Sequence, residues 1–500
     1  MPVTLRITPT IKSVASMTTK HPLPIKFDST SNGEFVPPTL SQRECHINQS
    51  ASDFIEKQSR HLGMKRRDFL LSSCAVASTL LVANQVNAEA GQTGGYYAVN
   101  KESASEKEVA DSIVGGNEFI FDIQGHFVDP NGRWLNQVPD SARPFAGLPN
   151  ASCGLSELPG DRSYLQCLGP EQFIKDVFMD SDTNMMVLSF VPSRREAEPL
   201  TIDEADATRR IVDELEGNHR LLLHGRVNPN QDGDLQGMDE LAEKWKISAW
   251  KTYTQWGPDG KGFFLHDDIG TAFIEKARKL GIKNICIHKG IPFGPRSYEH
   301  STCADIGIVA KRYPDVNFII YHSGFDPAIT ETAYRPGNKS GGIDSLVTSL
   351  IENDIKPNSN VYAELGSTWR FVMRHPEQAA HLMGKLIKYV GANNVLWGTD
   401  SIWYGSPQDQ IQAFRAFQIS EEWRDKFGYA DMTPELKSKI FGLNAVKPYK
   451  IAMSEVRAMM ATDKVALAKE NYQNNPSPHF QTYGPKTRRE FLNLKKWEAE

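Results

Sequence analysis

From residue 119 onward the sequence alternates between short apolar segments and longer stretches whose apolar residues recur at helical spacing. The apolar segments are rich in β-branched and aromatic residues, and their length is typical of buried strands. There are eight of them, at residues 119–124, 185–190, 220–226, 247–253, 284–288, 316–321, 361–364 and 394–399. The helical stretches include residues 202–215, 236–245, 268–280, 302–312 and 376–389. Strands that alternate with helices form βαβ units, so this order predicts a parallel sheet.

Eight βα repeats over residues 119–446 predict an α/β fold, the (β/α)8 TIM barrel. A doubly wound sheet is the alternative, although it does not naturally need eight repeats. Long segments follow the first and sixth predicted strands, at residues 130–170 and 323–345. Loops after strands lie at the C-terminal face of a barrel, where barrel enzymes have their active sites. Residues 447–500 are expected to form a C-terminal arm, packed on the barrel or on a second copy of the chain in a homo-oligomer.

The region before the barrel contains a pattern typical of a targeting segment. Basic residues 65–67 precede an apolar run at 69–82, and residues 86–88 place small side chains where a signal peptidase would cut. The order Arg-Arg-Asp-Phe-Leu resembles a twin-arginine export signal, which implies an exported, periplasmic protein. The alternative is a short hydrophobic helix packed on the domain. The domain prediction is therefore a leader at 1–90 with its signal peptide at 64–88, followed by a linker at 91–118.

Residues 1–63 within that leader are polar, rich in Ser and Thr and without periodicity. They are expected to be a disordered extension, or to reflect a start codon assigned too far upstream.

Composition excludes several classes of partner. The formal net charge is −5 and no long basic run occurs, so a nucleic-acid partner is not expected. No run of 18 apolar residues is present, so a permanent membrane span is not expected either. The six cysteines show no CxxC spacing, which argues against a structural zinc cluster. Cys153 and Cys167 flank a loop-like segment and are expected either to pair in an oxidising compartment or to stay free.

Polar side chains stand at the ends of six predicted strands. They are Gln124 and His126 at the first, Lys251 at the fourth, His288 at the fifth, His322 at the sixth, Glu364 at the seventh and Asp400 at the eighth. In a barrel these ends converge on one axis. Imidazoles and a carboxylate around an open position suit a divalent metal, Zn or Mn. A single strand-end histidine is more often structural, so the prediction depends on the joint arrangement.

This arrangement resembles the amidohydrolase superfamily, in particular its amidohydrolase-related (family 2) branch, which also contains metal-dependent decarboxylases. The resemblance covers about residues 119–446 and includes the segment IFGLNA at 440–445. The residues that match the family pattern are His126, His288, His322 and Asp400. The resemblance implies that Gln124, His126, His288 and Asp400 bind the metal. It also implies that His322 orients water or substrate and that Asp400 accepts the proton of the attacking water.

Position 124 departs from the family, where the first strand carries two histidines one residue apart. An amide oxygen is a weaker ligand than imidazole and suits harder cations, so looser metal binding or a preference for manganese is expected. The alternative is that Gln124 only bonds a neighbour in a metal-poor relative. Asp122 is expected to hold a ligand histidine in one tautomer. Lys251 is expected to be an unmodified lysine near substrate or near Glu364, in preference to a carbamylated metal bridge.

Aromatic and basic residues follow the strand ends and are expected to bind substrate. They are Arg226, Trp256, Trp369, Arg370 and Trp403, together with Phe127 and Tyr404. Aromatic walls with a guanidinium suit a flat ring bearing a carboxylate. The alternative is that the aromatics pack the long loops as a lid.

Three functions follow from this pattern. The first is a metal-dependent hydrolase in which metal-activated water attacks an amide, ester or lactone carbonyl, Asp400 moves the proton and His322 stabilises the oxyanion. The second is a metal-dependent, non-oxidative decarboxylase of an aromatic or unsaturated acid. The third is a metal-free exported binding protein. In each case the expected partner is a small molecule, such as an aromatic acid or a lactone.

Overall fold

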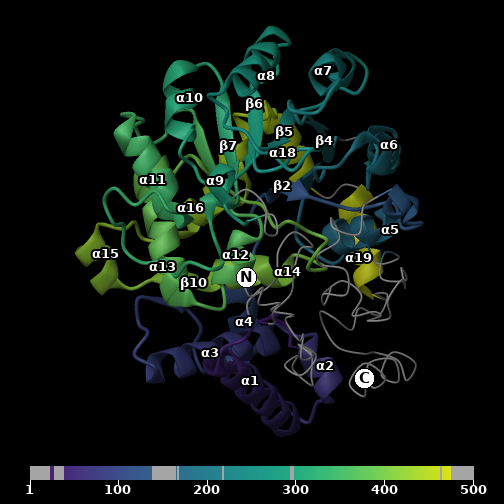
Figure 1. The fold of residues 1–500 in the computed structure, drawn as a ribbon. Coiled ribbons are helices and arrows are strands. Elements are labelled where there is room, and N and C mark those ends of the chain that lie inside the picture. The colour runs from purple at the N-terminus through teal and green to yellow at the C-terminus, as the bar shows by residue number, and fades with distance from the viewer. Residues whose placement is uncertain are drawn as a thin grey trace, which may run out of the picture.

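The fold is a barrel of parallel strands (Figure 1) in a computed structural model that describes residues 23–27, 39–137, 165, 168–216, 219–292, 298–461 and 464–474. The strands pair in chain order. They are β2 (Phe121–Gly125), β3 (Met185–Leu188), β4 (Leu221–Arg226), β5 (Ala249–Tyr253), β6 (Asn284–His288), β7 (Asn317–Tyr321), β8 (Val361–Glu364) and β9 (Val395–Leu396). Each lies within or overlaps one of the segments predicted to be strands, so the (β/α)8 prediction is confirmed.

Backbone hydrogen bonds join β2 to the segment that follows β9. Asp400 N donates to Gln124 O at 3.0 Å, and Ile402 N donates to His126 O at 3.1 Å. These bonds bring the first and last strand ends together, so two candidate metal ligands from opposite ends of the barrel sequence become neighbours.

Helices surround the barrel (Figure 1). The longer ones are α6 (Ile202–Glu216), α7 (Asp234–Glu243), α8 (Asp268–Lys279), α10 (Ile306–Arg312), α11 (Gly342–Glu352), α13 (Pro376–Lys385) and α14 (Gln408–Ala416). Short ones are α5 (Pro170–Ile174), α9 (Tyr298–Ser301), α12 (Thr368–Val372), α15 (Glu421–Phe427), α16 (Pro434–Ser438) and α17 (Asn444–Val446). In α8 the buried side chains recur at helical spacing, at Phe273, Ile274 and Ala277. Burying each large apolar side chain contributes about 2 kcal/mol, which holds such a helix on the sheet.

The C-terminal arm begins inside the barrel. Tyr449 is buried, and its hydroxyl lies 3.3 Å from His224 Nε2. Helix α18 (Met453–Met460) buries Val456 and Met459 against side chains of the barrel interior, and α19 (Lys464–Asn474) follows it. Most other residues of 447–460 are exposed, so this part of the arm packs on the barrel through a few buried side chains, which is one of the two predicted placements. Residues 475–500 of that arm lie outside the described ranges.

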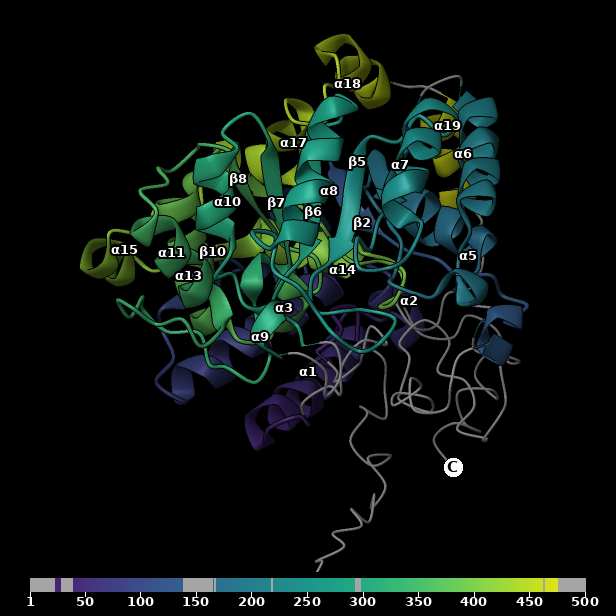
Figure 2. The same ribbon diagram turned by 45° about the horizontal axis from the view of Figure 1, so that its top comes forward.

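A layer of N-terminal helices lies against one side of the barrel (Figures 1 and 2, purple to blue). It contains α1 (Gln42–His61), α2 (Arg66–Leu70), α3 (Ser73–Glu89) and α4 (Lys107–Val114). Strand β1 (Gly95–Tyr97) pairs antiparallel with β10 (Phe417–Ile419), which fixes the layer to the barrel helices. The expectations of disorder at 39–63 and of a linker at 91–118 therefore differ from the structure.

Helix α3 occupies most of the predicted signal segment. Eleven of its 17 residues are buried, on all sides of the helix. A helix that is apolar all round is a buried helix, so the alternative prediction of a hydrophobic helix packed on the domain matches the structure. Export itself stays a prediction.

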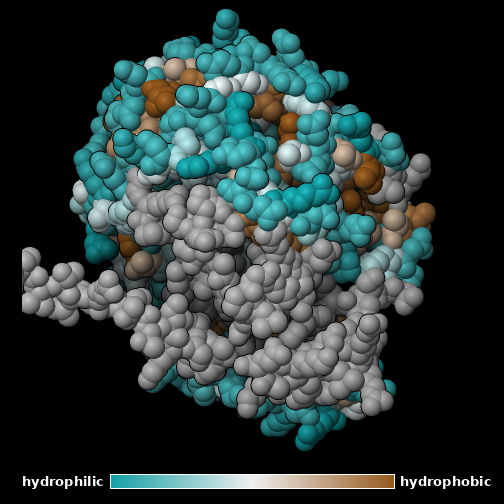
Figure 3. All heavy atoms as spheres, turned by 45° about the vertical axis from the view of Figure 1, so that its right-hand side comes forward, coloured by the Kyte–Doolittle hydropathy of each residue, from teal (hydrophilic) through white to brown (hydrophobic). Residues whose placement is uncertain are grey.

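Three remaining predictions concern the surface, a membrane span and the pairing of Cys153 with Cys167. On the face shown in Figure 3 the coloured surface is mainly hydrophilic, with separate small apolar patches. None of the helices in the described ranges has both the length and the apolar character needed to cross a bilayer. Cys153 and Cys167 lie outside those ranges, so their pairing stays a prediction.

Candidate active site

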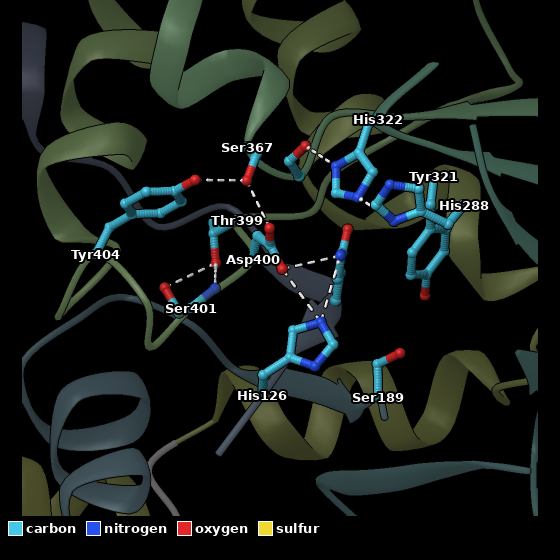
Figure 4. Close-up of polar contacts among 12 residues, drawn as sticks. His126, Ser189, His288, Tyr321, His322, Ser367, Thr399, Asp400, Ser401 and Tyr404 are labelled. Carbon is cyan, nitrogen blue, oxygen red and sulfur yellow. Dashed lines mark hydrogen bonds and ion pairs between the residues drawn. The ribbon is translucent and has the colours of Figure 1, made fainter. Parts of the chain in front are cut away.

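The strand-end residues meet at the C-terminal end of the barrel (Figure 4). His288 is the last residue of β6, and His322 opens the short helix η7 (His322–Gly324) directly after β7. Asp400 follows β9 and lies beside His126, which follows β2. All four side chains are buried, with at most 3% of any of them exposed. The four candidate ligands thus come from distant segments of the chain and are all buried from solvent.

The imidazoles of His288 and His322 face each other. His322 Nε2 lies 3.2 Å from His288 Nδ1. The other nitrogen of each ring lies next to a backbone carbonyl, His322 Nδ1 at 2.6 Å from Gly366 O and His288 Nε2 at 3.1 Å from Ile291 O. A carbonyl only accepts hydrogen bonds, so each outer nitrogen carries the proton and each inner nitrogen carries a lone pair.

Burial keeps both rings neutral. It lowers the pKa of His322 to about 4, and it lowers the pKa of His288 well below its ordinary value, with the neighbouring His322 adding to the effect. Two lone pairs that face each other at 3.2 Å repel unless a cation or a proton lies near them. The pair is therefore suited to donate to a Lewis acid.

Asp400 gathers hydrogen bonds from three side chains. Oδ1 lies 3.1 Å from His126 Nε2 and accepts from Gln124 Nε2 at 2.9 Å, while Oδ2 accepts from Ser367 Oγ at 2.5 Å. Burial alone would raise the pKa of Asp400, but hydrogen bonding and charge attraction to His126, with the bond from Ser367, lower it overall. The carboxyl group is therefore ionised at neutral pH.

Gln124 has an acceptor that the fold leaves unused. Its Oε1 is buried and has no hydrogen-bond partner among the described residues. A Cβ atom at Gly366 would lie only 2.2 Å from this oxygen, so the glycine provides the space for it. An unsatisfied buried acceptor costs about 1–3 kcal/mol, so a ligand that uses this oxygen would recover that free energy.

The candidate ligands are of types that bind a divalent metal, but in this structure they lie as two separate pairs. Within the described part of the chain, no three His, Cys, Asp or Glu side chains are grouped so as to hold a metal ion. One pair is His288 with His322, and the other is His126 with Asp400, which Gln124 also contacts. Two neutral imidazoles, a carboxylate and an unsatisfied amide oxygen are ligands that zinc and manganese accept.

Strained backbone is concentrated at this site. The φ angles of His322, Ser323, Ser367 and Asp400 are 62°, 55°, 53° and 60°. A residue with a Cβ atom pays about 1–2 kcal/mol to adopt this left-handed conformation. The surrounding contacts must hold these residues in place, which is typical of functional sites.

Glu364 supplies part of that support. Its Oε2 accepts from His322 N at 3.0 Å and its Oε1 accepts from Gly366 N at 2.5 Å. A Cβ atom at Gly398 would lie 1.6 Å from Oε1, so two glycines make room for the carboxyl group. Burial raises the pKa of Glu364 well above its ordinary value. Glu364 thus fixes the backbone of His322 and of the carbonyl that sets its tautomer.

Asp122 differs from its predicted contact, whereas Lys251 lies near Glu364, as expected. Asp122 Oδ1 accepts from Gln124 N at 3.0 Å and Thr399 N at 3.1 Å, so it ties β2 to the segment after β9; a contact with a ligand histidine was predicted. Burial raises the pKa of Asp122 to about 7. Lys251 is fully buried, with Nζ 3.6 Å from the ring centroid of Tyr321. Its charge also acts on Glu364, the carboxylate expected near it.

One predicted substrate-binding residue, Trp403, lies beside a candidate ligand, and a second, Arg370, lies next to Tyr404. The indole of Trp403 stacks on His126, with ring centroids 5.4 Å apart and an interplanar angle of 25°. The buried guanidinium of Arg370 lies 5.5 Å from the ring centroid of Tyr404, whose hydroxyl contacts Ser367 at 2.7 Å.

Three more of the predicted substrate-binding residues, Trp369, Arg226 and Trp256, have contacts elsewhere. The Trp369 indole packs against Phe414 and Phe417 in the core, and its Nε1 donates to Gln410 O. Arg226 bonds Ser193 and Glu198, and Glu198 also lines a cavity of about 410 Å³. Trp256 is buried, and its carbonyl accepts from Asn230 Nδ2. Trp369 is therefore a core residue by its contacts, and the guanidinium of Arg226 is engaged by protein groups.

Sequence reasoning missed Ser367 and Tyr253. Ser367 bonds Asp400, and Tyr253 stacks on His288 with ring centroids 4.7 Å apart. Tyr253 ends β5 and Ser367 follows β8, so the strand-end rule would have found both if it had been applied to hydroxyl residues.

A comparison with protein families finds one match. A family described as Amidohydrolase matches residues 181–451, more than half of the chain. The match begins after β2, so Gln124 and His126 lie outside it. No curated protein sequence matches the chain.

Solved structures with some similarity include enzymes of two kinds. One is a 5-carboxyvanillate decarboxylase from Novosphingobium aromaticivorans complexed with manganese and 4-hydroxy-3-methoxy-5-nitrobenzoic acid (15% identity, TM-score 0.46, 67% of this chain and 97% of that chain covered). Another is a 2,6-dihydroxybenzoate decarboxylase from Rhizobium (14%, 0.37, 67% and 99%). A third is an amidohydrolase from Burkholderia multivorans with bound zinc (13%, 0.38, 67% and 100%). Identities this low say nothing about reaction or substrate.

Proposed function

The chain belongs to the amidohydrolase family of enzymes, and on this premise we propose that it is a metal-dependent hydrolase of an amide, ester or lactone. One observation carries the proposal. His288 and His322 direct two lone pairs toward each other across 3.2 Å, in the same buried site as an ionised carboxylate, Asp400. Such a set can hold a Lewis acid and accept a proton.

We assign the metal to Gln124, His126, His288 and Asp400, with zinc or manganese as the ion. When bound, a divalent metal supplies Lewis acidity, which acidifies water and polarises a carbonyl. The unsatisfied Oε1 of Gln124 and the inner Nδ1 of His288 are the donor atoms that favour this assignment.

Asp400 is suited to the role of general base. Its lowered pKa keeps it ionised, so it can accept the proton of the attacking water and pass it to the leaving group. Of the two roles predicted for His322, its tautomer favours orienting water over stabilising an oxyanion. Because its Nδ1 proton goes to Gly366 O, its Nε2 accepts a hydrogen bond and orients water; it cannot donate to an oxyanion in this tautomer.

Decarboxylation of an aromatic acid is the second candidate. The observation that favours it is the indole of Trp403 on His126, with the buried guanidinium of Arg370 nearby at Tyr404. An indole and a guanidinium suit an aromatic carboxylate. That reaction needs a protonated group to protonate the ring carbon, and the lowered pKa of Asp400 leaves this carboxyl without a proton to donate at neutral pH. Hydrolysis therefore ranks first.

The test combines metal analysis with a substrate panel. The full chain is purified without chelator, its zinc and manganese are measured, and it is assayed on amides, esters, lactones and aromatic acids in ¹⁸O-labelled water. Hydrolysis incorporates label into the acid product, whereas decarboxylation releases carbon dioxide. Asp400→Asn is the inactive control. Absence of metal that added Zn²⁺ or Mn²⁺ does not restore, together with no turnover, would support the metal-free binding protein instead.

A further inference from the structure

A short N-terminal segment, residues 23–27, reaches the loop that carries Asp400. Lys26 in this segment is buried, with 7% of its surface exposed. Its Nζ donates to Tyr404 O at 2.5 Å and to Ser406 O at 3.4 Å, and it lies 3.7 Å from Asp409 Oδ1. The backbone of Lys26 also donates to Asp409 Oδ2 at 3.1 Å. One lysine therefore binds two carbonyls of the loop and the first turn of α14.

The contacts continue from this loop to the candidate base. The Tyr404 hydroxyl lies 2.7 Å from Ser367 Oγ, which donates to Asp400 Oδ2 at 2.5 Å. Trp403, between the two ends of the loop, stacks on His126. Loop 400–406 thus places a carboxylate, an indole and a phenol around the site, and Lys26 holds its far end.

The segment itself is firmly held. Ile25 and Phe27 are buried in the same apolar cluster as α1 and α3. Asn48 of α1 donates through Nδ2 to Phe27 O at 3.3 Å. Glu44 of α1 forms a buried ion pair with Arg374, at 3.1 Å, in the turn after α12. Segment 23–27 is therefore anchored by the N-terminal layer, which in turn is anchored to the barrel.

We propose that residues 23–27 are a clamp that the working protein retains, and that Lys26 is a positioning residue for loop 400–406. Cleavage after Ala88, as expected for the signal-like segment, would remove Lys26 along with α1 and α3. The clamp therefore requires that the chain remain uncut at this point, whether or not it is exported. The role of Asp400 in this inference rests on the proposed function, but the mechanical role of Lys26 does not.

Amide hydrogen exchange on the full chain tests the mechanical role. Lys26→Met keeps the size of the side chain and removes the donor, so exchange at residues 401–406 should quicken about tenfold or more as the loop opens locally. Lys26→Arg should restore most of the protection. Lys385→Met is the matched control, because it removes another buried lysine whose partners, Glu331 and Asp344, lie away from the loop. It should lower the melting temperature while leaving exchange at 401–406 unchanged.

A second readout is the affinity for Mn²⁺, measured by titration calorimetry. Lys26→Met should weaken it about tenfold, since loss of a group that supports a ligand typically costs about that much, and Lys385→Met should not. If Lys26→Met does not fold, Asp409→Asn is used in its place, because it weakens the same contact between Lys26 and α14. Unchanged exchange at 401–406 would overturn the clamp. Faster exchange with unchanged Mn²⁺ affinity and kcat would overturn the positioning role. If the protein neither binds metal nor turns over substrate, the proposed function is wrong. The hydrogen-exchange data would still test whether Lys26 holds loop 400–406 in place.

Intact mass of the protein from its own host tests retention. The clamp requires a chain that still contains residue 26. Active protein that begins near residue 89, with loop 400–406 protected, would overturn the proposal.

Discussion

His322 Nε2 and His288 Nδ1 face each other across 3.2 Å because each ring is held from behind by a backbone carbonyl. Gly366 O and Ile291 O therefore decide which atom of each ring can act as a ligand. The two histidines use different nitrogens, which side-chain identity alone does not reveal. A site of this kind depends on its backbone as much as on its side chains.

His288→Ala should remove bound metal and activity together, because it deletes one of the assigned ligands. We expect metal content near zero and kcat/KM reduced at least about a hundredfold. Metal analysis and steady-state kinetics measure both. His381→Gln is the matched control, since His381 is also buried but packs among Trp423, Phe427 and Tyr429. Full metal occupancy in His288→Ala would contradict the assignment.

Gln124→His should tighten zinc binding about tenfold or more, because imidazole is the better ligand for zinc. Competition with a chromogenic chelator measures the change. Gln124→Met, which removes the unsatisfied Oε1 at similar size, should weaken binding. If both variants bind zinc as the wild type does, Gln124 is not a ligand.

Ser367→Ala should move the acidic limb of the kcat/KM profile to higher pH. Ser367 stabilises the ionised form of Asp400, so its removal raises the pKa of that carboxyl group. A base with a lowered pKa works above that pKa and is lost as pH falls through it, so a raised pKa brings the loss in at higher pH. Ser345→Ala, whose hydroxyl bonds Gly342 O, is the control. An acidic limb at the same pH in both variants would exclude Asp400 as the base.

Glu364→Gln should lower kcat more than it raises KM. The amide can accept from only one of the two backbone N–H groups, His322 N or Gly366 N, and it presents a donor to the other. The lost bond should cost about 1–3 kcal/mol of the free energy of unfolding. Urea unfolding and kinetics separate the two effects. Glu331→Gln, at the buried Lys385 pair, should lose stability without the kinetic change.

The barrel and its strand ends were predictable because both follow from short-range pattern. Apolar segments of strand length and helical spacing give the βα order, and in that order His288, His322 and Asp400 must stand at one face. The amide oxygen of Gln124 could be named as a candidate ligand from the sequence. Its lack of a hydrogen-bond partner could not, because that depends on Gly366, which follows another strand.

The N-terminal layer could not be predicted with the same certainty, because a signal peptide and a buried helix share one pattern. Residues 73–83 form a mostly apolar run in either case, and only tertiary packing separates the two. The contacts of Trp369 and Arg226 could not be predicted for a similar reason. Their positions after strand ends are correct, but their partners, Phe414 and Glu198, come from segments that sequence spacing does not bring near.

The pairing of Lys26 with Asp409 also bears on how the chain is made. The two residues are 383 positions apart. At ribosomal rates of about 5–20 residues per second, the first segment emerges on the order of 20–80 s before its partner exists. Helix α3 packs mainly on α1 and α4, which are made shortly before and after it, so its apolar surface can be covered long before Asp409 is made. Segment 23–27 is thus among the first parts of the chain to be made, yet it reaches its final position only after the last barrel strand is complete.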